Sequence, residues 1–142
     1  MDIYSDPSSI ATAEQFKAAL LSVRDKFTKE NHYLDLLTAH YRSPSHTIST
    51  GRLAKEVGYT SYSAANSQYG ALAHHIADAF HIVLPPTPSG DPHWWRTLAY
   101  GNDGTPQTDD GCYEWIMRPE LVQALQELRW VRPCTKNVAL AF

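Results

Sequence analysis

The chain has 142 residues, of which 43% are hydrophobic and 19% charged, and its formal net charge is −3. This length suits one domain around one core. The negative charge excludes a general polycation, so a nucleic-acid partner requires a local basic patch. Two cysteines, Cys112 and Cys134, are too few for a disulfide framework and favour free thiols in a reducing cytoplasm.

The ends of the chain carry no targeting or membrane signal. Residues 1–9 have neither a basic region nor an apolar run, and no stretch reaches the ~18 apolar residues of a membrane span. We therefore expect a cytoplasmic protein without a membrane partner. The expected organisation is a flexible arm over residues 1–11, a single domain over 12–131 and a tail over 132–142. The apolar end of the tail suits pairing with a second copy, so a homodimer is open to this chain.

Apolar periodicity predicts two helices early in the chain. The first covers about residues 13–28, where Thr12 and Gln15 have the spacing of a capping box. The second covers about residues 30–42 and is stopped by Pro44. Residues 46–48 then form a short β-prone link.

Residues 48–80 have the pattern helix, tight turn, helix. The first of these helices begins at Ser49 or Thr50 and ends at Gly58. A long amphipathic helix follows, with apolar positions at Tyr62, Ala65, Tyr69, Leu72, Ile76 and Phe80. Ala54, Gly58 and Ala64 have the spacing of a helix-turn-helix, in which small residues let the helices approach closely.

Two strands and a final helix complete the pattern. The strands are expected at Trp94–Tyr100 and Cys112–Met117, joined by a long loop that contains three acids, and the helix begins at Pro119. The fold class is therefore mainly α with a small antiparallel β-hairpin. The order of elements is that of a winged helix-turn-helix with one extra helix at each end.

A polar face on the helix after Gly58 is the candidate DNA-reading surface. Ser63, Asn66 and Ser67 lie opposite its apolar stripe, and an Asn can pair with adenine in a major groove. An ordinary solvated face explains the same residues about as well. Flanking cations that can support phosphate binding are Arg42, Arg52, Lys55 and Arg96.

The distribution of charge argues against a strong grip on DNA. No Lys or Arg occurs between Lys55 and Arg96, across the helix that would read the bases. Phosphate contacts supply most of the affinity for DNA, so we expect modest, salt-sensitive binding. The acidic loop between the predicted strands would repel a DNA backbone.

Adjacent tryptophans mark a second candidate surface. Trp94 and Trp95 fall on a predicted strand, so their side chains should face opposite sides and one should be exposed. An exposed Trp there can stack on a base or anchor a protein partner.

Catalytic and metal-binding signals are weak. His74, Asp78 and His81 share a helix face and could hold a metal, but an exposed face has little to support one, and ordinary solvation explains them. Nucleophile-elbow, Walker and dinucleotide-binding motifs are all absent. We expect a non-catalytic protein without metal or cofactor.

Several motifs together resemble a module that accompanies bacterial HNH-type restriction-like endonucleases. The matching segments are LDLLTAHYRSP, LAKEVGY, AANSQYGALA, TLAYG and WIMRPELVQALQELRWV, between Leu34 and Val131. The resemblance implies a winged-helix-like fold that helps to engage DNA, either plain or modified. No His-rich ββα-metal segment follows Val131, so the nuclease activity does not carry over.

Two functions lead on these observations, and a small enzyme or metal protein built around His74, Asp78 and His81 ranks well below them. The first is recognition of double-stranded DNA by a protein of phage or mobile-element type, and the sequence favours it narrowly. The second is a protein-binding inhibitor of a bacterial defence system, of the anti-CRISPR type. The cation-free stretch and the negative net charge favour this second hypothesis.

Overall fold

The computed structural model describes residues 7–28, 31–82, 84, 93–102 and 113–131 of the chain. Within these ranges it is mainly helical with one small antiparallel sheet, as the sequence predicts. The α-helices are α1 (Ala13–Ser22), α2 (Tyr33–Arg42), α3 (Thr50–Val57), α4 (Tyr62–Phe80) and α5 (Pro119–Glu127). The strands are β1 (Thr47–Ser49), β2 (Ala99–Gly101) and β3 (Glu114–Met117), and short 3₁₀ turns are η2 (Arg24–Lys26), η3 (Pro44–His46) and η4 (Trp94–Thr97).

The sheet has the strand order β1-β3-β2, and both pairings are antiparallel. Ile48 of β1 pairs with Trp115 of β3, and Tyr100 of β2 pairs with Ile116 on the other side. The short link before α3 therefore adds a third strand to the predicted hairpin. This pairing ties the segment between α2 and α3 to the C-terminal part of the chain.

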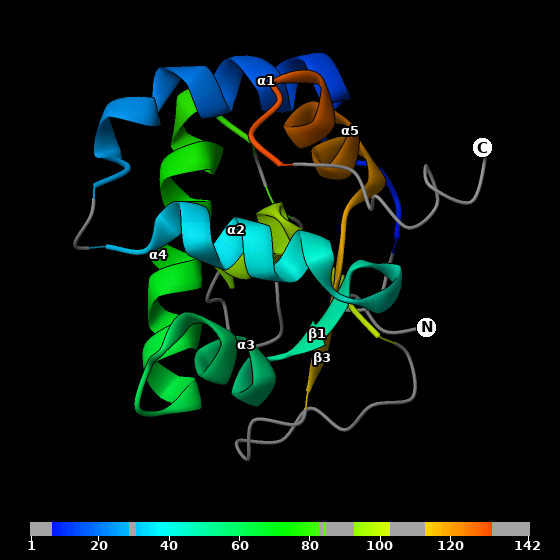
Figure 1. Cartoon of the computed structure of the whole chain (residues 1–142). Helices are drawn as coiled ribbons and strands as arrows, with labels where there is room; N and C mark the ends of the chain where they lie inside the picture. The colour runs from blue at the N-terminus through cyan, green and yellow to red at the C-terminus, as the bar shows by residue number, and fades with distance from the viewer. Residues whose placement is uncertain (1–6, 29–30, 83, 85–92, 103–112, 132–142) are drawn as a thin grey trace, which may run out of the picture.

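Helix α4 is the longest helix of the described chain and runs down the left side of the view in Figure 1. It packs against α1, α2, α3 and η4, while α5 lies alongside α1. In Figure 1, α1 crosses one end of α4 and α3 lies near the other end. The arrangement leaves one side of α4 uncovered by these elements, and that side is considered below.

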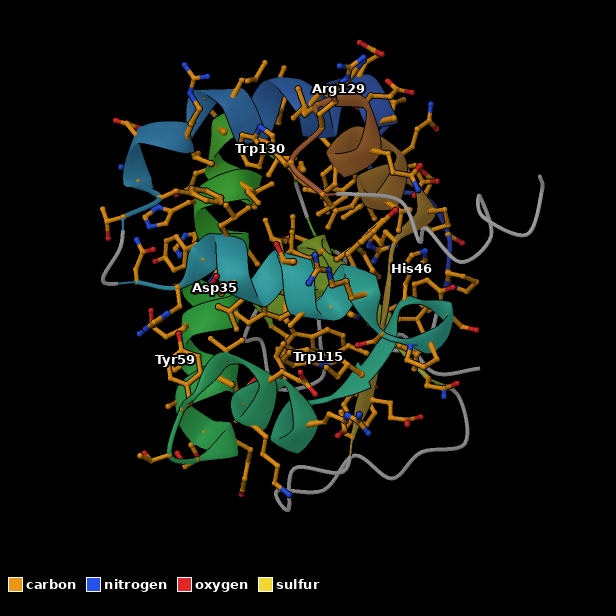
Figure 2. All side chains as sticks on the ribbon, viewed as in Figure 1. Asp35, His46, Tyr59, Trp115, Arg129 and Trp130 are labelled. Carbon is orange, nitrogen blue, oxygen red and sulfur yellow. The ribbon has the colours of Figure 1, made fainter. Side chains whose placement is uncertain are left out.

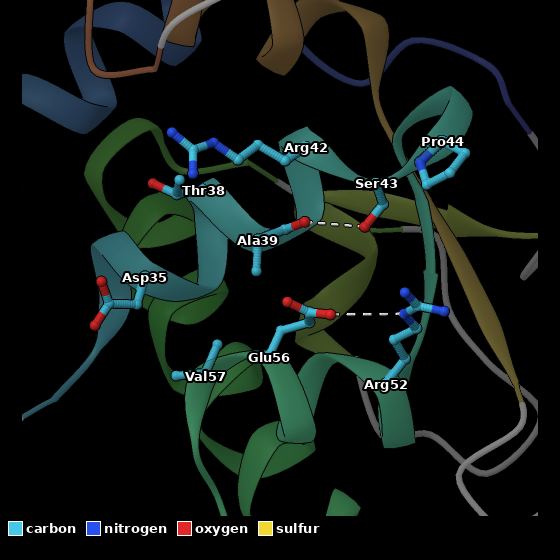
Figure 3. A pocket seen from close by; sticks show the side chains of 9 residues that line it. All are labelled: Asp35, Thr38, Ala39, Arg42, Ser43, Pro44, Arg52, Glu56 and Val57. Carbon is cyan, nitrogen blue, oxygen red and sulfur yellow. Dashed lines mark hydrogen bonds and ion pairs between the residues drawn. The ribbon is translucent and has the colours of Figure 1, made fainter. Parts of the chain in front are cut away.

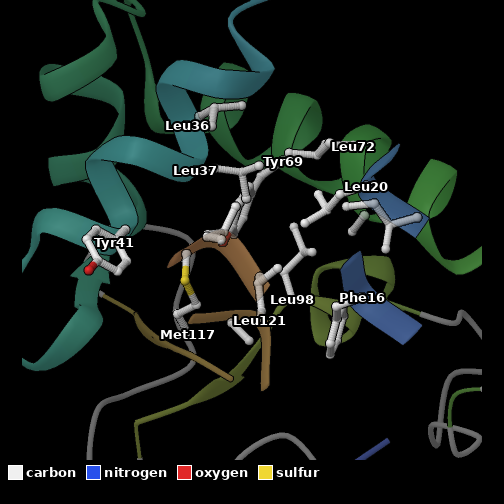
Figure 4. Close-up of a cluster of buried hydrophobic side chains, with 14 of the residues drawn as sticks. Phe16, Leu20, Leu36, Leu37, Tyr41, Tyr69, Leu72, Leu98, Met117 and Leu121 are labelled. Atoms are coloured by element: carbon white, nitrogen blue, oxygen red, sulfur yellow. The ribbon is translucent and has the colours of Figure 1, made fainter. Parts of the chain in front are cut away.

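The core is formed by apolar side chains from every α-helix and from the sheet (Figure 4). Fully buried members include Phe16, Leu20, Leu36, Leu37, Leu53, Tyr69, Leu72, Ile76, Leu98, Trp115, Met117 and Leu121. The buried stripe of α4 contains Ala65, Tyr69, Leu72 and Ile76, as predicted. Burying large side chains of this kind stabilises a fold by about 1.5–3 kcal/mol each before the opposing entropy is counted.

The first helix is shorter than predicted. Helix α1 has the predicted capping box, with the Gln15 N–H donating to Thr12 Oγ1 (3.1 Å) and the Thr12 N–H donating to Gln15 Oε1 (2.8 Å). It ends at Ser22, and the chain continues as η2. Asn31 Oδ1 accepts hydrogen bonds from the backbone N–H groups of Thr28 (3.3 Å) and Tyr33 (3.2 Å). Such local side-chain bonds fold the chain just before α2, whereas α1 has already ended at Val23, whose φ of −100° and ψ of 7° are not helical.

The predicted strand Trp94–Tyr100 is wrong over most of its length. Residues 94–97 form η4, and only Ala99–Gly101 are strand. His93 has φ 49°, and its carbonyl accepts from the Arg96 N–H at 3.0 Å. The turn packs on α4, and this tertiary contact overrides the strand preference of its aromatic residues.

The turn between α3 and α4 is close to the prediction. Gly58 ends α3 with φ 99°, and the N–H groups of Gly58 and Tyr59 both donate to the Ala54 carbonyl at 2.9 Å. This left-handed conformation favours glycine. In the first turns of α4, Ala65 is fully buried, whereas Ala64, one of the small residues of the predicted helix-turn-helix spacing, is only half-buried.

The segment before α1 is attached to the domain where the structure describes it. Ala11 is buried, and the Ser8 carbonyl accepts a hydrogen bond from Arg118 Nη1 at 2.9 Å. Ser8 and Ala11 therefore contact the domain, although the side chains at 7–9 are exposed. The tail over 132–142, the acidic loop and both cysteines lie outside the described residues.

Candidate nucleic-acid interface and adjoining groove

The predicted polar face of α4 is exposed to solvent. Ser63, Asn66 and Ser67 are all exposed, on the side opposite the buried stripe. Ser61 caps the helix by accepting the Ala64 N–H at 3.3 Å. The helix start is thus satisfied by its own cap, and the three polar side chains remain open to hydrogen bonding with a partner.

Two exposed cations lie on α3, the helix that packs against α4. The side chains of Arg52 and Lys55 are exposed, and Arg52 Nε lies 3.7 Å from Glu56 Oε1. An exposed pair at this distance contributes little energy, so it does not hold the guanidinium in place. Arg42 is also exposed, but it lies on α2 and lines a groove that is described below.

Arg96 does not belong to the basic surface that the sequence suggested. Its exposed fraction is 4%, the same as that of Arg118. Arg118 Nε donates to the Arg96 carbonyl at 2.8 Å, so both residues are built into the junction of η4 with the start of α5. A buried guanidinium cannot reach a phosphate in solution, which removes Arg96 from the candidate DNA contacts.

Trp94 and Trp95 do not face opposite sides of a strand, because they lie in η4. Trp95 is buried and stacks on Trp115, with ring centroids 5.5 Å apart and an interplanar angle of 22°. Trp94 is half-buried and stacks on His74 of α4 at 3.9 Å and 6°. Trp95 is therefore a core residue, and Trp94 is the member of the pair that reaches the surface.

His74, Asp78 and His81 do not form a metal-binding set. His74 Nε2 lies 3.4 Å from Asp78 Oδ2, and the His74 ring is covered on one face by Trp94. His81 lies at the left-handed C-cap of α4. Across the described residues, no group of three or more His, Cys, Asp or Glu side chains could hold a metal ion.

A buried polar network links α2, α4 and β3, and sequence reasoning did not identify it. His40 is completely buried, with Nδ1 2.5 Å from Tyr69 Oη and Nε2 3.0 Å from the Trp115 carbonyl. A carbonyl only accepts, so Nε2 carries the proton and Nδ1 accepts from the Tyr69 hydroxyl. Burial lowers the pKa of His40 from 6.5 to about 4, which keeps the ring neutral at pH 7.

This network is surrounded by stacked aromatic rings. Tyr69 stacks on Trp115 at 4.9 Å and 26°, and burial raises the pKa of its hydroxyl. Trp115 lies in the interior of the molecule (Figure 2). The sequence signal was present, because His40 falls at helical spacing with Leu36 and Leu37. Its position among apolar residues of α2 marks it as a core histidine.

A groove between α2 and α3 has a volume of about 470 Å³ (Figure 3). It is lined by Asp35, Thr38, Ala39, Arg42, Ser43 and Pro44 on the α2 side and by Arg52, Glu56 and Val57 on the α3 side. Two lining residues are basic and two are acidic. Arg42 and Arg52, two of the flanking cations in the sequence, line this groove from its α2 side and its α3 side (Figure 3).

Comparison with protein-family models, with curated proteins and with solved structures finds no match to this chain. Over the residues that the structure describes, no helix has both the length and the apolar character needed to cross a membrane.

Proposed function

We propose that this protein is a non-catalytic, DNA-binding module of the winged helix-turn-helix type. The observation that carries the proposal is the exposed face of α4, where Ser63, Asn66 and Ser67 adjoin a helix that presents Arg52 and Lys55. Uncharged donors and acceptors on a helix suit base edges in a major groove, and cations beside them suit the phosphates.

The order of elements supports this proposal. Strand β1 lies between α2 and α3, α4 follows a tight turn, and β1 joins the edge of the sheet beside β3. A winged helix-turn-helix has this order, and the second helix of its helix-turn-helix unit, which follows the turn, is the one that reads bases. The corresponding helix here is α4, whose polar side is the uncovered one.

The electrostatics predict weak rather than tight binding. Arg96 is buried and Arg42 lies on α2, whereas Arg52 and Lys55 lie on α3, the helix that precedes the turn into α4. These two exposed cations are therefore the ones assigned to the phosphates. Neutralising two phosphates gives a plot of log binding constant against log salt with a slope of about −2. Specificity would then depend on the three polar side chains of α4.

The test is fluorescence anisotropy with labelled duplex DNA, plain and methylated, across a salt series. We expect saturable binding that weakens as salt rises. Reversing both charges, with Arg52→Glu and Lys55→Glu, should weaken binding to all sequences. Each lost cation should reduce the slope of log binding constant against log salt by about one, so the slope should come close to zero. Asn66→Ala should reduce discrimination between sequences instead. Arg24→Glu with Lys26→Glu, at two exposed sites on η2, is the matched charge control.

A second candidate function is inhibition of a bacterial defence protein by direct binding, in the manner of an anti-CRISPR protein. The observation that favours it is the half-buried Trp94, stacked on His74 in a stretch without Lys or Arg from residue 56 to 95. Tryptophan is enriched among residues that dominate protein interfaces. A neutral surface with such an anchor suits a protein better than a polyanion.

The two functions predict opposite results from the same variants. If DNA is the partner, Arg52→Glu with Lys55→Glu should do more damage than Trp94→Ala. If a defence protein is the partner, this chain, when immobilised, should capture that protein, Trp94→Ala should abolish the capture, and the charge reversals should have little effect. Absence of DNA binding even at low salt would leave the second function as the better supported one.

A further inference from the structure

The α2–α3 groove has the dimensions of a small-molecule site. Its volume of about 470 Å³ lies within the ~300–1,000 Å³ that is usual for ligand pockets. Its floor includes the short side chains of Ala39 and Val57, which leave the space between the helices unfilled (Figure 3). Arg52 and Glu56 lie on the α3 side of the groove, and Arg42 extends beside Thr38 on the α2 side.

The basic side chains of the groove keep hydrogen-bond donors available. Arg52 Nε is 3.7 Å from Glu56 Oε1, which is beyond the length of an N–H···O hydrogen bond. Arg42 forms no ion pair or hydrogen bond through its side chain with any part of the described chain. A guanidinium offers paired N–H groups that match the geometry of a carboxylate or phosphate.

The remaining polar side chains of the groove act as acceptors. The Ser43 hydroxyl donates its hydrogen to the Ala39 carbonyl at 2.9 Å, so its oxygen can only accept from a ligand. The Glu56 carboxylate also accepts only. Asp35, which also lines the groove, has its Oδ2 atom 3.1 Å from His32 Nδ1. The groove therefore combines two sets of cationic donors with acceptors for hydroxyl groups.

We propose that this groove binds a small organic anion that carries hydroxyl groups. Arg52 takes the anionic group beside Ser43, Arg42 turns from its place over Thr38 toward the same group, and Ser43 and Glu56 accept hydrogen bonds from the hydroxyls. The anionic group is a carboxylate or a phosphate, since both have the same geometry toward a guanidinium. This site does not depend on DNA binding, although Arg52 belongs to both surfaces and an anion in the groove would compete for it.

The experiment is a titration of the ¹⁵N-labelled protein followed by amide chemical shifts, without DNA. The probes are ribose 5-phosphate, gluconate, inorganic phosphate and uncharged ribose at matched ionic strength. We expect saturable shifts at Thr38, Ala39, Ser43 and Val57 with one of the two organic anions, and the responding probe distinguishes phosphate from carboxylate. Arg42→Ala and Arg52→Ala should each weaken binding about tenfold.

The controls separate a built site from general charge. Arg24→Ala removes an exposed cation outside the groove and should leave the affinity unchanged. Ser43→Ala should weaken the organic anion but not inorganic phosphate. The proposal is overturned if neither organic anion shifts the groove amides, or if inorganic phosphate binds with an affinity equal to that of the organic anions. It is also overturned if Arg24→Ala weakens binding as much as the groove variants do. Unchanged urea midpoints for the arginine variants would exclude loss of folding as the cause.

Discussion

Replacing Tyr69 by Phe should destabilise the fold although the aromatic ring remains. The change removes the hydroxyl that donates to His40 Nδ1 at 2.5 Å, in a site where both residues are completely buried. Nε2 still has to donate to the Trp115 carbonyl, so the ring cannot change tautomer, and Nδ1 becomes a buried acceptor without a donor. Losing the bond and leaving that acceptor unsatisfied together cost about 2 kcal/mol.

The measurement is urea unfolding followed by far-ultraviolet circular dichroism at pH 7.5. Tyr69→Phe should lower the midpoint without changing the slope with denaturant. Tyr62→Phe, on the same helix but only half-buried, is the matched control and should cost less than about 0.5 kcal/mol. In a His40→Leu background, Tyr69→Phe should cost much less, because the acceptor is gone. Equal losses for Tyr69→Phe and Tyr62→Phe would refute the reasoning.

Three further predictions concern the same fold. Burial lowers the folded-state pKa of His40 from 6.5 to about 4, so between these pH values the unfolded chain binds a proton that the folded chain excludes. The free energy of unfolding is therefore at its full value above pH 6.5 and falls by about 3 kcal/mol as the pH drops to 4. Urea midpoints measured across this range should show the loss, and His40→Leu should reduce it. Gly58→Ala should lower stability by about 1 kcal/mol in thermal unfolding, because φ is 99° and alanine is strained in that conformation. No clash adds to this cost, since an added Cβ meets nothing within 4 Å. Ser61→Ala should cost about 1 kcal/mol by calorimetry, since it removes the cap of α4, and Ser61→Asp should restore it.

Local signals gave the helices correctly where each residue's neighbours in sequence decide its structure. The Thr12 capping box, the left-handed Gly58 and the buried stripe of α4 depend on spacings of three or four residues, which can be read directly. The exposed face with Ser63, Asn66 and Ser67 followed from the same periodicity.

Features that depend on contacts between distant segments could not be predicted in this way. Trp94 and Trp95 have strong strand preference, but stacking on His74 and Trp115 fixes them in a turn. The burial of Arg96 depends on its place beside Arg118, 22 residues away. The α2–α3 groove likewise forms only when the two helices pack together, so no spacing of residues along the sequence predicts it.

The position of β1 has a consequence for how the chain acquires its structure. Helices α2, α3 and α4 are neighbours in sequence, yet β1 between them finds its partner in β3, and His40 finds an acceptor 75 residues further along. A ribosome-bound chain that has emerged only as far as α4 lacks both. In such a chain β1 has no strand to pair with and His40 Nε2 has no carbonyl to donate to. Both contacts form only after β3 has emerged, so the tertiary structure of the helices is completed late.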